Sequence, residues 1–241
     1  MADEKVERTP HGDIIYRHTD SKSFEPVFDS PNVEQIQRHV EKYVGKVENV
    51  FHEIISNFVH VDILLVKPTP QRNFCTLVTS GMSQRPMKTP PGVQGCEYAE
   101  LLICLPPDWP MTDEAMKDES NYWPFRWLKI LARFPHEYDS WLWYGHTLPN
   151  GNPARGFARN TQLSGIILAP PLMVPEEFGV LRINETKSIQ FFSMFPIYTD
   201  EMNYKLNNGA DGLFELMDQQ KVNLILDVHR PSVCKRSLWP F

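Results

Sequence analysis

Two apolar strands followed by an aromatic helix constrain what this chain can fold into more than any other feature. Residues 74–80 and 97–105 are apolar runs bounded by turn residues, which is typical of buried strands. From Asn121 the apolar residues recur at helical spacing, so that Trp123 and Trp127 lie on one face. A helix with such a stripe packs on an apolar surface. The pattern therefore predicts an α/β (α+β) fold with a central mixed β-sheet flanked by helices.

Other segments extend this pattern in both directions along the chain. Pro31 stands at the first position of a predicted helix that Gly45 ends. Thr199 begins a helix that Gly209 breaks, and another helix follows from Leu213. Further strands are predicted over residues 60–66, 162–168, 179–183, 188–198 and 222–228, while residues 47–55 fit either a strand or a continuation of the helical region.

Pro135 should end the aromatic helix at Phe134, because a proline disfavours helical geometry in the residue before it.

The chain is expected to form a single domain. No break resembles a flexible linker between domains. We expect a loosely ordered lead-in over residues 1–30, the domain over residues 31–228 and a C-terminal tail over residues 229–241.

Composition limits the classes of function and the setting of the protein. The formal net charge of −6 argues against a nucleic-acid binder, which normally presents a basic face. The 4 cysteines include no Cys-x-x-Cys pair, and a chain of 241 residues is too large to depend on disulfide bonds. The N-terminus lacks the apolar centre of a signal peptide, and no apolar run is long enough to span a bilayer. We expect a cytoplasmic protein that contacts no membrane.

Motifs for cofactor and metal binding are incomplete. The segment at residues 151–156 has the glycine spacing of a phosphate-binding loop, but Phe157 stands where that loop requires lysine. A metal site would use His136, Asp139 and His146, but these residues lack the spacing of a zinc helix. The sequence therefore predicts neither a cofactor nor a metal site.

Catalysis is not indicated by any complete motif, although one alternative stays open. No Gly-x-Ser-x-Gly turn is present, and Cys104 lies among apolar residues that raise a thiol pKa. Glu100 lies within an apolar strand, where a carboxylate is either on an amphipathic edge or buried and paired, with Arg126 as a possible partner. An enzyme that acts on a small molecule through Glu100, His136 or His146 remains the alternative to a binding protein.

Aromatic residues after the predicted helix form either a contact surface or a fully buried part of the core. Tyr138, Trp141, Trp143 and Tyr144 follow one another closely. In an extended segment alternate side chains point apart, so these rings cannot all enter one core. Exposed tryptophan and tyrosine are favoured anchors in protein interfaces.

Six ordered segments carry a more specific signal than any single motif. They are Thr-Leu-Val-Thr-Ser-Gly-Met-Ser at residues 76–83, Tyr-Ala-Glu-Leu-Leu-Ile-Cys-Leu-Pro at 98–106, Asn-Tyr-Trp-Pro-Phe-Arg-Trp-Leu-Lys-Ile-Leu-Ala-Arg-Phe-Pro at 121–135, Tyr-Gly-His at 144–146, Leu-Met-Val-Pro-Glu-Glu at 172–177 and Ile-Tyr-Thr-Asp-Glu-Met at 197–202. With these segments the chain resembles the suppressor of fused domain over roughly residues 60–220, and it is similar to the stand-alone bacterial members of that family.

The resemblance implies a non-enzymatic protein-binding domain. Animal relatives hold a transcription factor by clamping an extended peptide, partly through strand addition, and bacterial relatives include immunity proteins that neutralise toxins. Phe134 and residues 144–146 fall at positions that take part in peptide binding, with Gly145 in place of an acidic residue. We therefore expect a protein partner, either a toxin domain or an extended peptide, or alternatively a self-associating adaptor. The predicted partner-binding residues are Phe134, Tyr138, Trp141, Trp143, Tyr144, Gly145, His146, Arg155 and Arg159.

Overall fold

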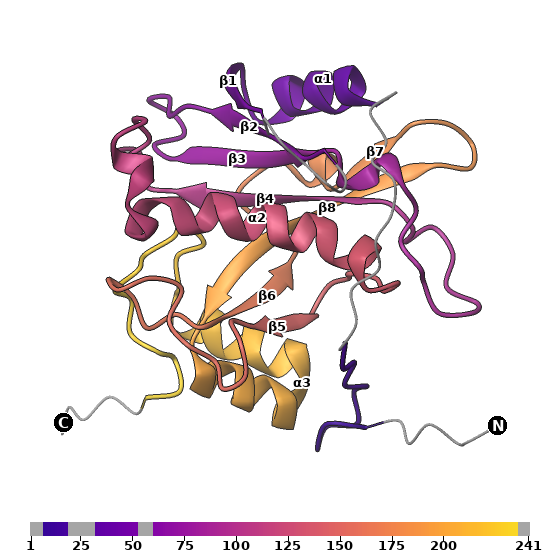
Figure 1. The fold of residues 1–241 in the computed structure, drawn as a ribbon, viewed down its shortest axis with the longest axis vertical. Helices are drawn as coiled ribbons and strands as arrows, with labels where there is room; N and C mark the ends of the chain where they lie inside the picture. The colour runs from indigo at the N-terminus through magenta and orange to yellow at the C-terminus, as the bar shows by residue number, and fades with distance from the viewer. Residues whose placement is uncertain (1–6, 19–31, 53–59, 236–241) are drawn as a thin grey trace.

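A single eight-stranded mixed sheet organises the molecule (Figure 1). The computed structural model describes residues 7–18, 32–52 and 60–235. The strands are β1 (Val47–Phe51), β2 (Asp62–Val66), β3 (Cys75–Ser80), β4 (Ala99–Leu105), β5 (Thr147–Pro149), β6 (Gly165–Ala169), β7 (Val180–Arg182) and β8 (Ser188–Ile197). The helices are α1 (Val33–Tyr43), α2 (Glu119–Glu137) and α3 (Thr199–Gln219), with short 3-10 turns η1 (Met82–Gln84), η2 (Ala115–Lys117) and η3 (Glu176–Gly179).

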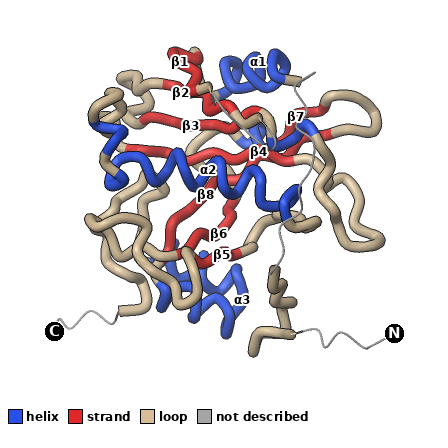
Figure 2. The backbone as a smooth tube through the Cα atoms, in the orientation of Figure 1, coloured by secondary structure: helices blue, strands red, loops and turns tan. Residues whose placement is uncertain are grey.

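The strand order is β1-β2-β3-β4-β8-β6-β5, and β7 pairs with the first half of β8. Among the strands of the described chain, β4 and β8 form the parallel pair and the other pairs are antiparallel, which makes the sheet mixed as the sequence predicts. The ten-residue β8 reaches across the sheet, because its first half pairs with β7 and β4 and its second half pairs with β6. β5 is therefore the end strand on the side of α3 (Figure 2).

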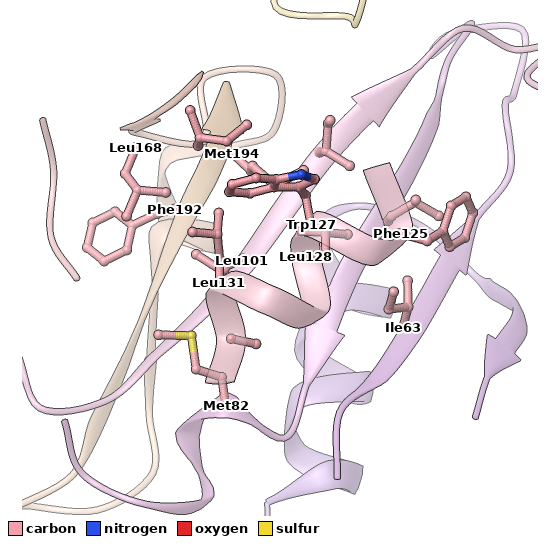
Figure 3. Packing of buried hydrophobic residues seen from close by; sticks show 14 of the residues in the cluster. Ile63, Met82, Leu101, Phe125, Trp127, Leu128, Leu131, Leu168, Phe192 and Met194 are labelled. Carbon is pink, nitrogen blue, oxygen red and sulfur yellow. The ribbon is translucent and has the colours of Figure 1, made fainter. Parts of the chain in front are cut away.

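Helices cover both faces of the sheet. α2 crosses one face, where Trp127, Leu128 and Leu131 enter the largest apolar cluster together with Leu101 of β4 and Met194 of β8 (Figure 3). On the other face, α1 packs on β2, β3 and β4 in a second cluster. α3 packs against β6 and the end of β8 in a third cluster. No helix in the described part of the chain is long and apolar enough to cross a membrane.

The aromatic helix is longer than the sequence predicts. α2 begins after Asp118, whose side chain accepts a hydrogen bond from the Ser120 N–H. It continues through Pro135 to Glu137, so the prediction of an end at Phe134 is wrong. A proline removes one hydrogen bond from a helix, but the next turn still closes because the Tyr138 N–H donates to the Phe134 carbonyl oxygen at 3.1 Å.

Two further predictions concern the ends of the domain. The helix that begins at Thr199 does break at Gly209, where φ is +80°, and α3 is two helical pieces joined at this kink. The strand predicted over residues 222–228 does not form; this segment makes only an isolated bridge between Ile225 and Cys104. The hairpin of β7 and β8 and the end of α1 before Gly45 are confirmed. The predicted helix start at Pro31 lies outside the described residues.

The segment after residue 228 is anchored by a buried ion pair. Arg230 is 8% exposed and Glu201 is fully buried, and two guanidinium nitrogens each donate to one carboxylate oxygen at 2.6 Å. The Val233 N–H donates to the same carboxylate at 2.9 Å. Tyr198 donates a short hydrogen bond from its hydroxyl to the Arg230 carbonyl oxygen. These contacts attach the C-terminal segment to the start of α3.

Candidate functional site

A groove of about 1100 Å³ opens between α2 and α3, with β5 along its floor. Trp127, Ile130 and Phe134 of α2 form one wall, and Met202 and Lys205 of α3 stand on the other. The lining includes apolar and aromatic side chains together with charged ones. A concave surface with an apolar body and a few polar groups is the usual form of a binding site.

The segment between α2 and β5 is held in the groove by unusual backbone geometry. Gly145 has φ of +74°, a conformation that favours glycine. A Cβ atom at Gly145 would lie 2.7 Å from the Cβ of Ala210 in α3, which is too close for two carbon atoms. The Gly145 N–H donates to the Leu168 carbonyl oxygen of β6 at 2.8 Å. Glycine at this position thus lets the aromatic segment pass between β6 and α3.

His146 is a neutral structural side chain in the groove wall. Its Nδ1 accepts a hydrogen bond from the Trp143 N–H at 3.2 Å, and its ring meets the edge of Trp141 with centroids 4.8 Å apart. Burial, followed by the charge of the nearby Lys205 ammonium, lowers the pKa of His146 to about 4. The imidazole therefore carries no charge at neutral pH.

Tyr144 joins the aromatic segment to α3. Its hydroxyl donates to Oδ1 of Asp211 at 2.8 Å, and its ring lies against Phe214. Burial, followed by the hydrogen bond to Asp211, raises the pKa of Tyr144 to about 12. The phenol remains protonated and acts as a fixed hydrogen-bond donor at the rim of the groove.

Residues 7–18, which pass beside α3 in Figure 1, contribute part of the groove lining, and we call this segment the N-terminal strap. Its Asp13 accepts a hydrogen bond from Nζ of Lys205 at 3.2 Å, and the Lys205 side chain is 9% exposed. The His11 N–H donates to the Leu206 carbonyl oxygen at 3.2 Å. The His11 ring occupies the space beside Gly209, where an added Cβ would meet it at 2.8 Å. The break in α3 thus makes room for the strap.

The far end of the strap contacts the aromatic end of α2. The His18 ring meets Phe134 edge-on with centroids 5.2 Å apart and lies 5.3 Å from the Tyr138 ring. Tyr16 stacks on His18 from within the strap. Burial lowers the pKa of His18, which favours the neutral ring. Phe134 and Tyr138 therefore form a pocket for a flat ring.

The structure brings together part of the predicted partner-binding set. Phe134, Tyr138, Trp141, Tyr144, Gly145 and His146 all line the groove. Trp143 instead packs edge-on against Phe192 of β8. Arg159 pairs with Asp118 at 2.6 Å, at the opposite end of α2, and Arg155 is exposed in a turn outside the groove lining. Whether any of them contacts a partner stays a prediction.

Sequence reasoning missed the groups that face the aromatic residues. The strap shows no periodicity, and Lys205 and Asp211 belong to an amphipathic helix whose charges usually face solvent. A signal was present at Gly209, because a glycine that breaks a helix often has a packing or functional reason.

Glu100 is saturated by hydrogen bonds. Its Oε1 accepts from the Gly81 N–H at 3.0 Å and from the N–H and hydroxyl of Ser83 at 3.0 and 2.7 Å, while Oε2 accepts from the Thr79 hydroxyl at 2.6 Å. Arg126, suggested as its partner, instead pairs with Glu119. The Glu100 carboxylate therefore fixes the loop after β3.

His136 of the enzyme alternative, the Cys104 thiol and the residues suggested for a metal site also lack the arrangement that catalysis or metal binding requires. His136 Nε2 lies 3.0 Å from the Met82 carbonyl oxygen, and burial lowers the pKa of His136. Burial raises the pKa of the Cys104 thiol to about 11, as the sequence predicts. Within the described ranges, His136, Asp139 and His146 do not form a group that could share one metal ion.

The family model for suppressor of fused protein matches residues 58–231. A putative suppressor of fused homologue from Neisseria gonorrhoeae superposes with a TM-score of 0.55 at 15% identity, over 85% of this chain and 98% of that one. The Sufu–Fu complex gives a TM-score of 0.60 at 16% identity, over 85% and 93% of the two chains. Drosophila Suppressor of Fused gives 0.50 at 17% identity, over 73% of this chain and 43% of that chain. No curated protein matches the sequence.

Proposed function

Because this chain belongs to the suppressor of fused family, we propose that it binds a protein partner by taking an extended segment of that partner into the groove. The observation that carries this proposal is that the strap, a stretch of polypeptide, already lies against groove residues and forms part of the groove lining. The strap places a carboxylate and an imidazole ring against groove residues. The strap turns back on itself at Gly12, where Arg8 and Ile14 form an antiparallel bridge, and runs on to His18. A surface that binds one stretch of chain through such contacts has the chemistry to bind another.

The strap indicates which side chains the groove selects. The Lys205 ammonium is largely buried beside Asp13, so a partner segment should offer a carboxylate there. The pocket of Phe134 and Tyr138 holds the His18 ring, so an aromatic or imidazole ring should follow five positions later. We therefore expect a segment with an acidic residue and a flat ring at this spacing.

β5 supports strand addition as the means of main-chain binding. It is the end strand of the sheet, and β6 is its only strand partner among the described residues. Thr147 and Leu148 line the groove and carry both backbone donors and acceptors, whereas Pro149 has no N–H to offer. An extended segment along β5 would gain main-chain hydrogen bonds, and the side-chain pockets would provide selectivity.

The partner that fits best is a toxin domain in the same cell, which this protein would neutralise by binding and without catalysis. The net charge of −6 would speed the approach of a basic protein such as a nuclease. One structural neighbour was solved as a Sufu–Fu complex, so a protein of this fold does form a complex with another protein. Neutralisation in the cytoplasm needs only occupancy of the toxin, which a tight groove complex would supply.

A peptide added in trans tests the groove directly. Residues 7–18 belong to none of the three buried core clusters of the described chain, so a chain that lacks residues 1–18 should keep its fold. A labelled peptide of residues 7–18 should bind the truncated chain saturably in a fluorescence polarisation titration. Phe134→Ala and Lys205→Met should each weaken binding by at least about tenfold. Arg155→Ala, outside the groove lining, is the matched control.

The result against the proposal would be no saturable binding, or equal binding of a scrambled peptide. The toxin assignment is tested separately with the full chain in its native cells. A stoichiometric partner should be recovered with the wild-type chain and lost with Phe134→Ala, and co-expression should suppress its toxicity. A partner retained equally by both chains would place the interface outside the groove.

A further inference from the structure

Two histidines and an aspartate converge where β1 ends and β2 begins. Phe51, the last residue of β1, pairs with Ile63 of β2, which brings the next residue, His52, beside Asp62. His60 stands two positions before Asp62 in the sequence. Nδ1 of His52 lies 3.1 Å from Oδ1 of Asp62, and Nε2 of His60 lies 2.9 Å from the same oxygen.

The shared oxygen is buried but has no hydrogen-bond partner in the described part of the chain. Asp62 is 8% exposed, and its Oδ1 makes no hydrogen bond although two ring nitrogens lie within 3.1 Å. An N–H aimed along either contact would make a strong bond at this distance. Neither ring makes a hydrogen bond to this oxygen, so in the tautomer with its proton on the other nitrogen each ring can offer a lone pair to an ion at this point.

A second orphaned oxygen stands beside the first. Ser80 of β3 is the direct strand partner of Asp62, so the two side chains share one face of the sheet. The Ser80 hydroxyl oxygen is also buried without a hydrogen-bond partner in the same described region. Buried polar atoms are nearly always satisfied by protein groups, water or an ion, so two such oxygens side by side form a place where an ion can bind.

We propose that His52, His60 and Asp62 bind a zinc ion. Zinc takes imidazole nitrogen and carboxylate oxygen at about 2.0 to 2.2 Å, so neighbouring ligand atoms lie roughly 3.3 Å apart in a tetrahedral site. The three ligand atoms here all lie within 4.8 Å of one another, and the two contacts to Asp62 are only slightly shorter than that spacing. Small side-chain rotations suffice to admit the ion.

The chemistry of the three ligands favours zinc over a hard cation. Two neutral imidazoles and one carboxylate suit zinc, whereas calcium and magnesium prefer oxygen ligands alone. The His52 side chain is 68% exposed, which leaves the outer side of the site open to water or to a group from another molecule. The bound ion would fasten the end of β1 to β2 and satisfy the Asp62 oxygen.

This site was not visible in the sequence. His52 and His60 are separated by seven residues, a spacing that matches no common zinc motif. Strand pairing brings them together, and such pairing cannot be read from one strand alone. The proposal stands apart from the groove, because none of its three residues lines the groove.

Calorimetric titration of the chelator-treated full chain with zinc tests the proposal. The wild-type chain should take up one saturable equivalent of Zn²⁺, and Co²⁺ should give the visible absorption of a nitrogen- and oxygen-bound ion. His52→Ala and Asp62→Asn should weaken uptake by at least about tenfold, the loss that even indirect partners of a metal ligand cause. His229→Ala removes another exposed histidine and should leave uptake unchanged.

If Asp62→Asn fails to fold, zinc uptake by His52→Ala tests the proposal alone, because the exposed His52 ring contributes little packing and its loss should not unfold the chain. Zinc should also raise the melting temperature of the wild-type and His229→Ala chains but not that of His52→Ala. The proposal is overturned if the wild-type chain takes up no saturable equivalent. It is equally overturned if His52→Ala binds zinc as tightly as the His229→Ala control.

Discussion

Replacing Glu100 by glutamine tests whether the Glu100 carboxylate stabilises the fold or is free to act in catalysis. The side-chain oxygen of glutamine can keep the three donors that Oε1 accepts, but its amide group then faces the Thr79 hydroxyl. An amide nitrogen cannot accept a hydrogen bond, so the Thr79 proton loses its acceptor while the Thr79 oxygen still accepts the Leu101 N–H at 2.8 Å. We expect Glu100→Gln to disturb the loop after β3 without creating a cavity.

The magnitude follows from the bonds that are lost or weakened. A buried donor left without an acceptor costs about 1 to 3 kcal/mol, and loss of the charge weakens the other three bonds. We therefore expect the free energy of unfolding to fall by about 3 kcal/mol. For a chain of this length that loss lowers the melting temperature by about 6 to 12 °C.

Urea unfolding and a thermal melt of Glu100→Gln measure this change, with Glu177→Gln as the matched control because Glu177 is exposed. The control should stay within about 0.5 kcal/mol of the wild-type chain. If Glu100→Gln also changed stability by less than that, the four hydrogen bonds would not be holding the loop. The carboxylate would then be available for the enzyme alternative.

Three other perturbations follow from the groove and its supports. The pKa of His146 is about 4 in the folded chain and lies below its ordinary value of 6.5, so between those pH values only the unfolded chain binds this proton. The free energy of unfolding should therefore fall as the pH drops through that range, by at most about 3 kcal/mol. The same pH series on His146→Gln should show a smaller fall. Arg230→Met should lower the free energy of unfolding by about 3 to 5 kcal/mol because it leaves the Glu201 charge buried, and a loss under about 1 kcal/mol in chemical denaturation would contradict this. Gly145→Ala should cost about 1 to 3 kcal/mol through its positive φ and the contact with Ala210, and the same melt on Gly145→Ala with Ala210→Gly should recover only part of the loss.

Periodicity was sufficient to predict the core of this fold. The apolar runs that became β3 and β4 and the stripe that includes Trp123 and Trp127 gave the correct elements, because burial and helical spacing act locally. The helix end predicted before Pro135 was wrong, because a proline near the C-terminal end of a helix removes only one backbone hydrogen bond and few turns remain after it. The short β5 was hidden among turn residues, since three residues carry too little pattern.

The site was predictable only in part, for a similar reason. The aromatic residues from Phe134 to His146 indicated that some rings stay outside the core, because alternate side chains of an extended segment point apart. Their role in binding a partner stays a prediction. Lys205, Asp211 and the strap reach the groove through tertiary packing, and nothing in their local sequence marks that contact.

Competition by the strap is the most direct test of the groove as a peptide-binding site. A labelled peptide of residues 7–18 is titrated into the full chain and into the chain that lacks residues 1–18. The tethered strap acts at an effective concentration that is typically about millimolar, so the full chain should bind the peptide at least about tenfold more weakly than the truncated chain. Equal dissociation constants for the two chains would mean that the peptide binds elsewhere, and would contradict the account.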